Sequence, residues 1–128
     1  MTTNNTPVPN TKESVETASE TYISYDDFAK LDIRIGTITS ATPVPDTDKL
    51  LQLQVDVGSE TRQIISGIRE YFDDYTWLVG KQCPFICNLA PRVIRGLESQ
   101  GMILAANHDA TLGILIPHNH LPPGTAVH

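Results

Sequence analysis

The sequence predicts an all-β domain with one or two short helices, arranged as a small five-stranded barrel. Residues 51–57 alternate strictly between apolar and polar side chains, which is the period of a half-buried strand. A Gly-Ser-Glu turn follows, and the run 62–68 is expected to return beside that strand as a hairpin. A short helical segment before the next strand is the third observation that indicates this class.

The first ordered element is predicted to be one helical turn over 25–31. Ser24 is a good N-cap residue, and Asp27 three positions later completes a capping-box pattern. The next run, 32–38, alternates and then changes phase near Gly36. A glycine at a phase change inside a strand indicates a bulge or a sharp bend.

The second half of the chain continues with short elements. The aromatic-rich segment 70–78 predicts a short helix or turn. Residues 81–89 predict a strand, and Pro84 within it indicates an edge position, because proline has no N–H for a ladder. A loop is expected over 90–100. The remaining elements are two short strands and a tail with proline and glycine, over 101–106, 112–116 and 117–128.

The order of these elements favours an OB-fold barrel. In that barrel a bent strand is followed by a hairpin, and a helix separates the third strand from the fourth. An SH3-like barrel or a small sandwich shares the strand count and remains an alternative. The OB-fold domain is expected over 22–128. Residues 1–21 are polar with few apolar side chains, which predicts a disordered extension.

The charge of the chain is unevenly distributed. The 128 residues carry a net charge of −6, which argues against a uniformly basic nucleic-acid-binding surface. However, no acidic residue occurs between Asp74 and Glu98, a stretch that contains Lys81, Arg92 and Arg95. A local patch can bind phosphate while the net charge keeps the rest of the protein soluble.

The sequence predicts a cytoplasmic protein with no membrane association. No apolar run approaches the length of a membrane-spanning helix, and the polar N-terminus lacks the apolar region of a secretory signal. Cys83 and Cys87 fall in an apolar run without a second cysteine pair. We interpret them as buried apolar residues and not as zinc ligands.

No set of residues indicates catalysis. The chain lacks a G-x-S-x-G elbow and a glycine-rich phosphate loop. The pair His118 and His120 lies between prolines without further ligands at metal spacing, which is typical of a solvated loop. The acidic loop 46–48 is too short for an EF-hand. We therefore predict that the chain is not an enzyme and uses neither cofactor nor metal.

The segment 88–102 carries side chains suited to RNA. Its two arginines offer forked donors to phosphate, and its amide and hydroxyl groups suit a base edge or a 2′-OH. Its methionine offers a soft apolar surface to a base. The alternative is an ordinary surface loop whose arginines pair with Glu98 and neighbouring acids. The candidate contacts are Asn88, Arg92, Arg95, Ser99 and Met102.

Several spaced blocks resemble, in order, the tRNA-binding domain family. The family includes the C-terminal domain of some bacterial methionyl-tRNA synthetases, free-standing tRNA-binding proteins and CsaA-type secretion chaperones. The match runs from about Asp26 to the C-terminus. Its blocks are DFAKLDIRIG at 27–36, DTDKLL at 46–51, VDVG at 55–58, RQIISGI at 62–68 and NLAPR to GMILAA at 88–106.

The resemblance implies an OB-fold that binds tRNA by shape and backbone, and a homodimer for stand-alone members. An aminoacyl-tRNA synthetase is a further candidate partner. The alternative function is that of a CsaA-like export chaperone, which would bind polypeptide through apolar strand faces and the tail near Leu121. The residues placed at or near the RNA are Arg34, Lys49, Asn88, Arg92, Arg95, Ser99 and Met102.

Overall fold

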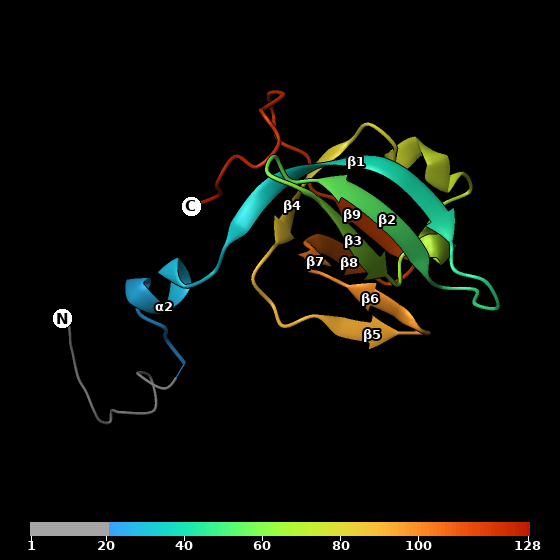
Figure 1. The fold of residues 1–128 in the computed structure, drawn as a ribbon, viewed down its shortest axis with the longest axis horizontal. Helices are drawn as coiled ribbons and strands as arrows, with labels where there is room; N and C mark the ends of the chain where they lie inside the picture. Colours follow the sequence, from blue (N-terminus) through green and yellow to red (C-terminus); the bar gives the residue numbers. More distant parts are fainter. Residues whose placement is uncertain (1–20) are drawn as a thin grey trace. The chain divides into compact units, whose positions relative to one another are not determined.

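A computed structural model describes residues 21–128 of the chain (Figure 1). The chain divides into two units, the first ending at Leu31 and the second comprising Asp32–His128. The predicted disordered extension lies outside the described residues except for Thr21, so it stays a prediction, as does the predicted domain boundary. Among the described residues, no helix combines the length and the apolar character needed to cross a bilayer.

The described part of the first unit contains one short helix, α2 (Tyr25–Ala29). The Ser24 hydroxyl accepts a hydrogen bond from the Asp27 backbone N–H at 3.1 Å. In return, the Asp27 carboxylate accepts one from the Ser24 backbone N–H at 3.4 Å. These bonds satisfy N–H groups that have no partner inside the helix. The predicted capping box and helical turn are therefore confirmed.

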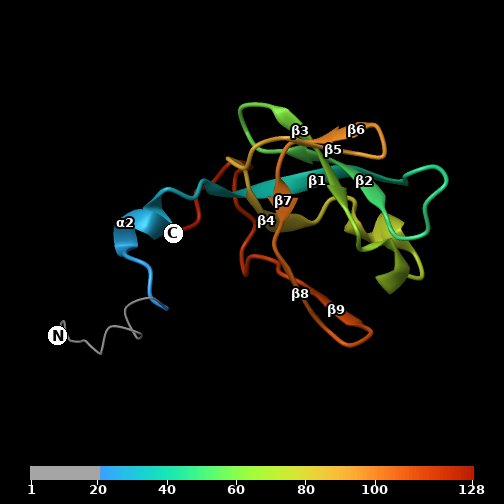
Figure 2. The same cartoon turned by 90° about the horizontal axis from the view of Figure 1, so that it is seen from below.

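The second unit is built on a five-stranded antiparallel sheet that curls into a nearly closed barrel (Figures 1 and 2). Its strand order is β3-β2-β1-β4-β7. This confirms the predicted class, mostly β with an OB-like barrel. The strands are β1 (Ile33–Pro43), β2 (Leu51–Asp56), β3 (Thr61–Ser66), β4 (Gln82–Ile86) and β7 (Met102–Ile103).

Short elements complete the second unit. The segment predicted to be a short helix or turn forms two 3-10 turns between β3 and β4, namely η1 (Arg69–Tyr71) and η2 (Tyr75–Leu78). Two hairpins each form a sheet of their own, and Figure 2 shows the second one extending away from the barrel. Their strands are β5 (Arg92–Ile94), β6 (Leu97–Ser99), β8 (Ala105–His108) and β9 (Thr111–Ile114).

One hydrophobic core fills the barrel. Leu51, Leu53 and Val55 alternate along β2 and are fully buried, as the period-2 pattern predicts. Phe85 of β4 is the largest of the fully buried side chains. A Cβ atom at Gly36 would lie 2.5 Å from Val55 Cγ1 and 2.9 Å from Phe85 Cδ1. Position 36 therefore admits only glycine without displacing two core side chains.

The structure corrects two details of the predicted strands. The register of β1 against β2 shifts between Ile38 and Ser40, so the irregularity lies beyond Gly36, which instead permits close packing. β4 is not an edge strand, because β1 and β7 flank it. Pro84 is tolerated there because it stands opposite Ile35, whose backbone groups bond to the C-terminal tail and not to β4.

The C-terminal tail extends the sheet beside the first half of β1. The Ile35 N–H donates to the Thr125 carbonyl, and the Val127 N–H donates to the Ile33 carbonyl, both at 2.8 Å. The buried Gln82 side chain fixes the start of this stretch by bonding both backbone groups of Leu121. The tail thus covers an edge of β1 that β2, paired only from Thr37 onward, does not reach.

Cys83 and Cys87 are free thiols inside the barrel, 0% and 5% exposed. Their prediction as buried core residues is confirmed. Burial raises the pKa of the Cys83 thiol to about 11 and also raises the pKa of Cys87. Both thiols are therefore protonated at neutral pH and are poor nucleophiles.

Candidate nucleic-acid interface

The segment predicted to be a loop over 90–100 contains the β5–β6 hairpin. Arg92 pairs with Ser99, and the two-residue turn is formed by Arg95 and Gly96. Both turn residues have positive φ, 53° and 80°, as in the type I′ turn that matches the twist of paired strands. The prediction of a loop is therefore wrong. The hairpin was hard to recognise because its turn is Arg-Gly, not the usual Asn-Gly or Asp-Gly, and because each of its strands has only three residues.

Side chains hold this hairpin to β3. The Ser99 hydroxyl accepts a hydrogen bond from the Ile65 backbone N–H at 3.0 Å and donates to the Gly101 carbonyl at 3.2 Å. The Gln63 amide donates to the Glu98 carbonyl at 2.9 Å. Ser99 is only 5% exposed, so its hydroxyl serves the fold. An RNA contact by Ser99 stays a prediction. To donate to RNA, the hydroxyl would have to give up its bond to the Gly101 carbonyl.

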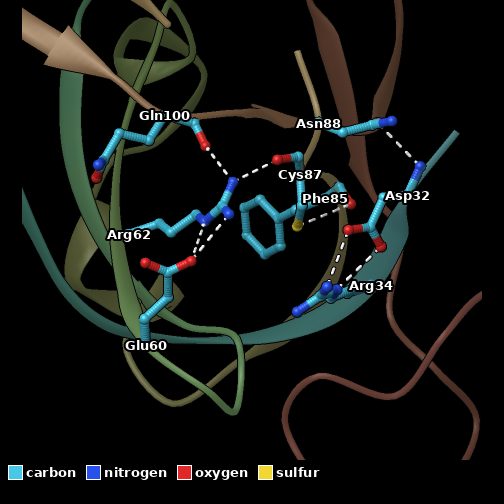
Figure 3. A network of polar contacts seen from close by, with 8 residues as sticks. All are labelled: Asp32, Arg34, Glu60, Arg62, Phe85, Cys87, Asn88 and Gln100. Carbon is cyan, nitrogen blue, oxygen red and sulfur yellow. Dashed lines mark hydrogen bonds and ion pairs between the residues drawn. The ribbon is translucent and has the colours of Figure 1, made fainter. Parts of the chain in front are cut away.

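Arg34 and Asn88 belong to a polar network beside the end of β4 (Figure 3). Arg34 forms a two-pronged ion pair with Asp32, in which both N···O distances are 2.9 Å. The hydrogen bond to Asp32, and then its charge, raise the pKa of Arg34. The Asn88 side-chain oxygen accepts from the Asp32 backbone N–H at 2.9 Å. A phosphate at Arg34 would therefore compete with Asp32.

Three predicted cations differ from Arg34. Within the part of the chain that the structure describes, the side chains of Lys49, Arg92 and Arg95 have no hydrogen-bond or ion-pair partner. They can bind a phosphate without first releasing a carboxylate, so their charge is available to a ligand. The other described cations bond carboxylates, a carbonyl or an aromatic ring, and they are Lys30, Arg34, Arg62, Arg69 and Lys81.

Lys49 and Arg95 line one groove of about 340 Å³ between the β1–β2 loop and the tip of the β5–β6 hairpin. Asp46 and Asp48 also line it and reduce its positive charge. These loops correspond to those with which OB-folds bind oligonucleotides, since they join the first to the second and the fourth to the fifth barrel strand. We name this feature, with the adjoining segment 88–102, the L-groove.

Exposed apolar side chains lie beside these cations. Met102, which was predicted, is 44% exposed and lines a pocket of about 70 Å³ together with Arg92 and Leu89. Sequence reasoning missed Leu89 and Val93, which are 43% and 74% exposed. Strand alternation could have found Val93. Its neighbour Ile94 is partly buried, and adjacent residues of a strand point to opposite faces. Cations next to apolar surface suit the phosphates and bases of RNA.

Comparison with known proteins decides the family. The family model described as "Putative tRNA binding domain" matches residues 33–126. The chain belongs to this tRNA-binding domain family. The methionine–tRNA ligase of Bacteroides fragilis is 50% identical over 106 residues, which cover 82% of the chain and 16% of the ligase. That of Methanocorpusculum labreanum is 48% identical over 120 residues, covering 93% and 17%. The chain thus spans about a sixth of the length of these relatives.

Two solved structures have the same fold as this tRNA-binding domain. The MetRS related protein from Pyrococcus horikoshii has a TM-score of 0.78 at 32% identity, covering 84% of this chain and 98% of that chain. The chaperone CsaA from Bacillus anthracis has a TM-score of 0.73 at 28% identity, covering 84% and 99%. The resemblance found in the sequence blocks is confirmed, and the similar structures include both a MetRS related protein and a CsaA chaperone.

Proposed function

We propose that this chain is a non-catalytic tRNA-binding module that recognises tRNA by shape and backbone through the L-groove. The observation that carries the proposal is the gathering of unpaired cations, Lys49, Arg92 and Arg95, on the loops with which OB-folds bind nucleic acid. Membership of the tRNA-binding domain family supports the class of ligand.

The acidic net charge sets the expected strength of binding. With a net charge of −6, the protein has no long-range attraction for RNA, and binding depends on a few local contacts. If each of the three cations neutralises one phosphate, the logarithm of affinity falls by about 2 to 3 for each tenfold rise in salt. Such binding is moderate in strength and strongly salt-dependent.

A gel-shift titration with bulk tRNA at several salt concentrations tests this function. Between about 50 mM and about 200 mM salt we expect affinity to fall about 30-fold, because counterions compete for three phosphate contacts. Duplex DNA at equal phosphate concentration is the control for shape recognition, and we expect it to bind more weakly. Absent binding at low salt, or binding indifferent to salt, would refute the proposal.

We further propose that the module is a homodimer, which would present two L-grooves to one tRNA and raise its avidity. The β8–β9 hairpin offers a surface for self-association. All four residues of β8 are exposed, and Leu115 and Ile116 after β9 are 45% and 49% exposed. Light scattering tests this point. For the free protein we expect a mass of twice 14.1 kDa, and with tRNA a larger complex that contains two protein chains. A mass of one chain for the free protein would contradict the dimer.

An aminoacyl-tRNA synthetase is the proposed protein partner. The support is that the similar domains belong to much longer methionine–tRNA ligases. A cytoplasmic location is part of the same proposal, and the free buried thiols fit a reducing compartment. Co-sedimentation with purified methionyl-tRNA synthetase and tRNA tests the partnership, which fails if the two proteins sediment independently.

Polypeptide binding, as by a CsaA-like export chaperone, is the second candidate. It is favoured by the structural similarity to CsaA and by the exposed apolar residues Leu115 and Ile116. The two functions make different demands on the arginines of the L-groove, so a variant of those arginines separates them.

A further inference from the structure

Arg62 on β3 holds both ends of the segment that forms one wall of the L-groove. Figure 3 shows its guanidinium between two backbone carbonyls. One Nη atom donates to the carbonyl of Cys87 and, at 3.2 Å, to that of Gln100. These carbonyls lie immediately outside the segment 88–99, which contains the hairpin and its two unpaired arginines.

The position of Arg62 is itself fixed. Its Nε and the second Nη atom donate to the Glu60 carboxylate at 3.0 and 2.9 Å. Four of its five N–H groups are thereby engaged. The side chain is 21% exposed, and its charge is balanced by Glu60. Arg62 is therefore poorly suited to bind phosphate and well suited to hold backbone.

Arg69 of η1 has the same relation to the opposite wall. Its guanidinium donates to the Thr47 carbonyl at 2.8 Å. Its backbone N–H donates to the Lys49 carbonyl at 3.1 Å. Both acceptors lie in the loop 46–50, which places Lys49 at the groove. Neither Arg62 nor Arg69 is among the residues that line the groove or the adjoining pocket.

We propose that Arg62 and Arg69 are positioning residues for tRNA binding, each of which fixes the backbone of one wall of the L-groove. Arg62 orders the wall 88–99, and Arg69 orders the wall 46–50. This inference rests on the proposed function of the groove. Fixed walls remove the cost of ordering two loops when RNA binds, so the unpaired cations meet their phosphates with less loss of entropy.

The variants Arg62→Met and Arg69→Met test the proposal, and each is the matched control for the other. Both remove a guanidinium and keep an unbranched side chain. In amide hydrogen exchange of the free protein, we expect Arg62→Met to accelerate exchange in 88–99 and leave 46–50 unchanged. We expect Arg69→Met to give the reverse pattern, because each arginine holds only its own wall.

The binding assay gives the second readout. Each variant is expected to bind bulk tRNA about tenfold more weakly. The reason is that RNA binding must then order a wall that the charged hydrogen bonds of the arginine no longer hold. The salt dependence of binding should equal that of the wild type, because the phosphate contacts re-form once the wall is ordered. A salt slope lower by about 1 would overturn the proposal and assign a direct phosphate contact to the substituted arginine.

Arg62→Lys guards against a variant that fails to fold. A lysine retains the charge and can donate to one of the two carbonyls, so we expect affinity between those of the wild type and Arg62→Met. Unchanged exchange, or acceleration spread equally over both walls, overturns the proposal. If the wild type does not bind tRNA, both the proposed function and this inference fail. If the variants show wall-specific exchange but bind tRNA with unchanged affinity, only the positioning role is refuted.

Discussion

Replacing both arginines of the β5–β6 hairpin, in Arg92→Ala/Arg95→Ala, lowers affinity for bulk tRNA by about 100-fold at low salt. Each arginine offers a charge-assisted hydrogen bond, and one such bond contributes roughly tenfold or more to binding. The salt slope is expected to fall by about 2, because two phosphates are no longer neutralised. Both side chains are exposed and have no polar partner among the described residues, so folding should be unaffected.

Lys81→Ala is the control for this variant. Lys81 lies 4.5 Å from the centroid of the Trp77 ring and does not line the groove, so its removal should leave tRNA binding close to that of the wild type. The double variant should keep the unfolding midpoint of the wild type. If it binds tRNA with wild-type affinity, the L-groove is not the RNA surface. If the double variant also retains its function in the cell, the polypeptide-binding alternative is favoured, because that function does not need the two arginines.

Phe85→Ala is expected to destabilise the barrel by about 3–5 kcal/mol, the usual cost of truncating a buried phenylalanine. Phe85 is fully buried and fills the space left by the missing side chain of Gly36. That cost is a large share of the roughly 5–15 kcal/mol by which a domain is stable. Urea unfolding followed by circular dichroism measures the loss.

Val93→Ala is the matched control, since Val93 is 74% exposed and its truncation should change the free energy of unfolding by less than about 0.5 kcal/mol. Phe85→Leu keeps part of the volume and should fall between the wild type and Phe85→Ala. If Phe85→Ala costs less than about 1 kcal/mol, the residue is not at the centre of the core.

The elements that the sequence predicts well are those determined by neighbouring residues. The strand β2 follows from the alternation of 51–57, and the start of α2 follows from Ser24 and Asp27. The β5–β6 hairpin was missed because its stability comes from β3, through bonds such as Ser99 to Ile65. These partners are 34 residues apart in the chain, and no local pattern reports such a pairing.

The candidate site is predictable to a similar extent. Sequence blocks select Lys49, Arg92 and Arg95, but which cations stay unpaired depends on the tertiary structure. The neutralisation of Arg34 had a local signal, because Asp32 is two residues away and therefore on the same face of an extended chain. The hydrogen bond between Ser99 and Ile65 had no local signal, because the two residues are 34 positions apart in the chain.

The most direct test of the L-groove is amide hydrogen exchange of the wild-type protein with and without saturating tRNA. If the L-groove is the RNA surface, the added protection is concentrated in 46–50 and 88–102, where the unpaired cations lie. The β8–β9 hairpin should exchange alike in both states, because tRNA does not contact it. Protection confined to that hairpin or the C-terminal tail, with both walls of the groove unchanged, would contradict the account.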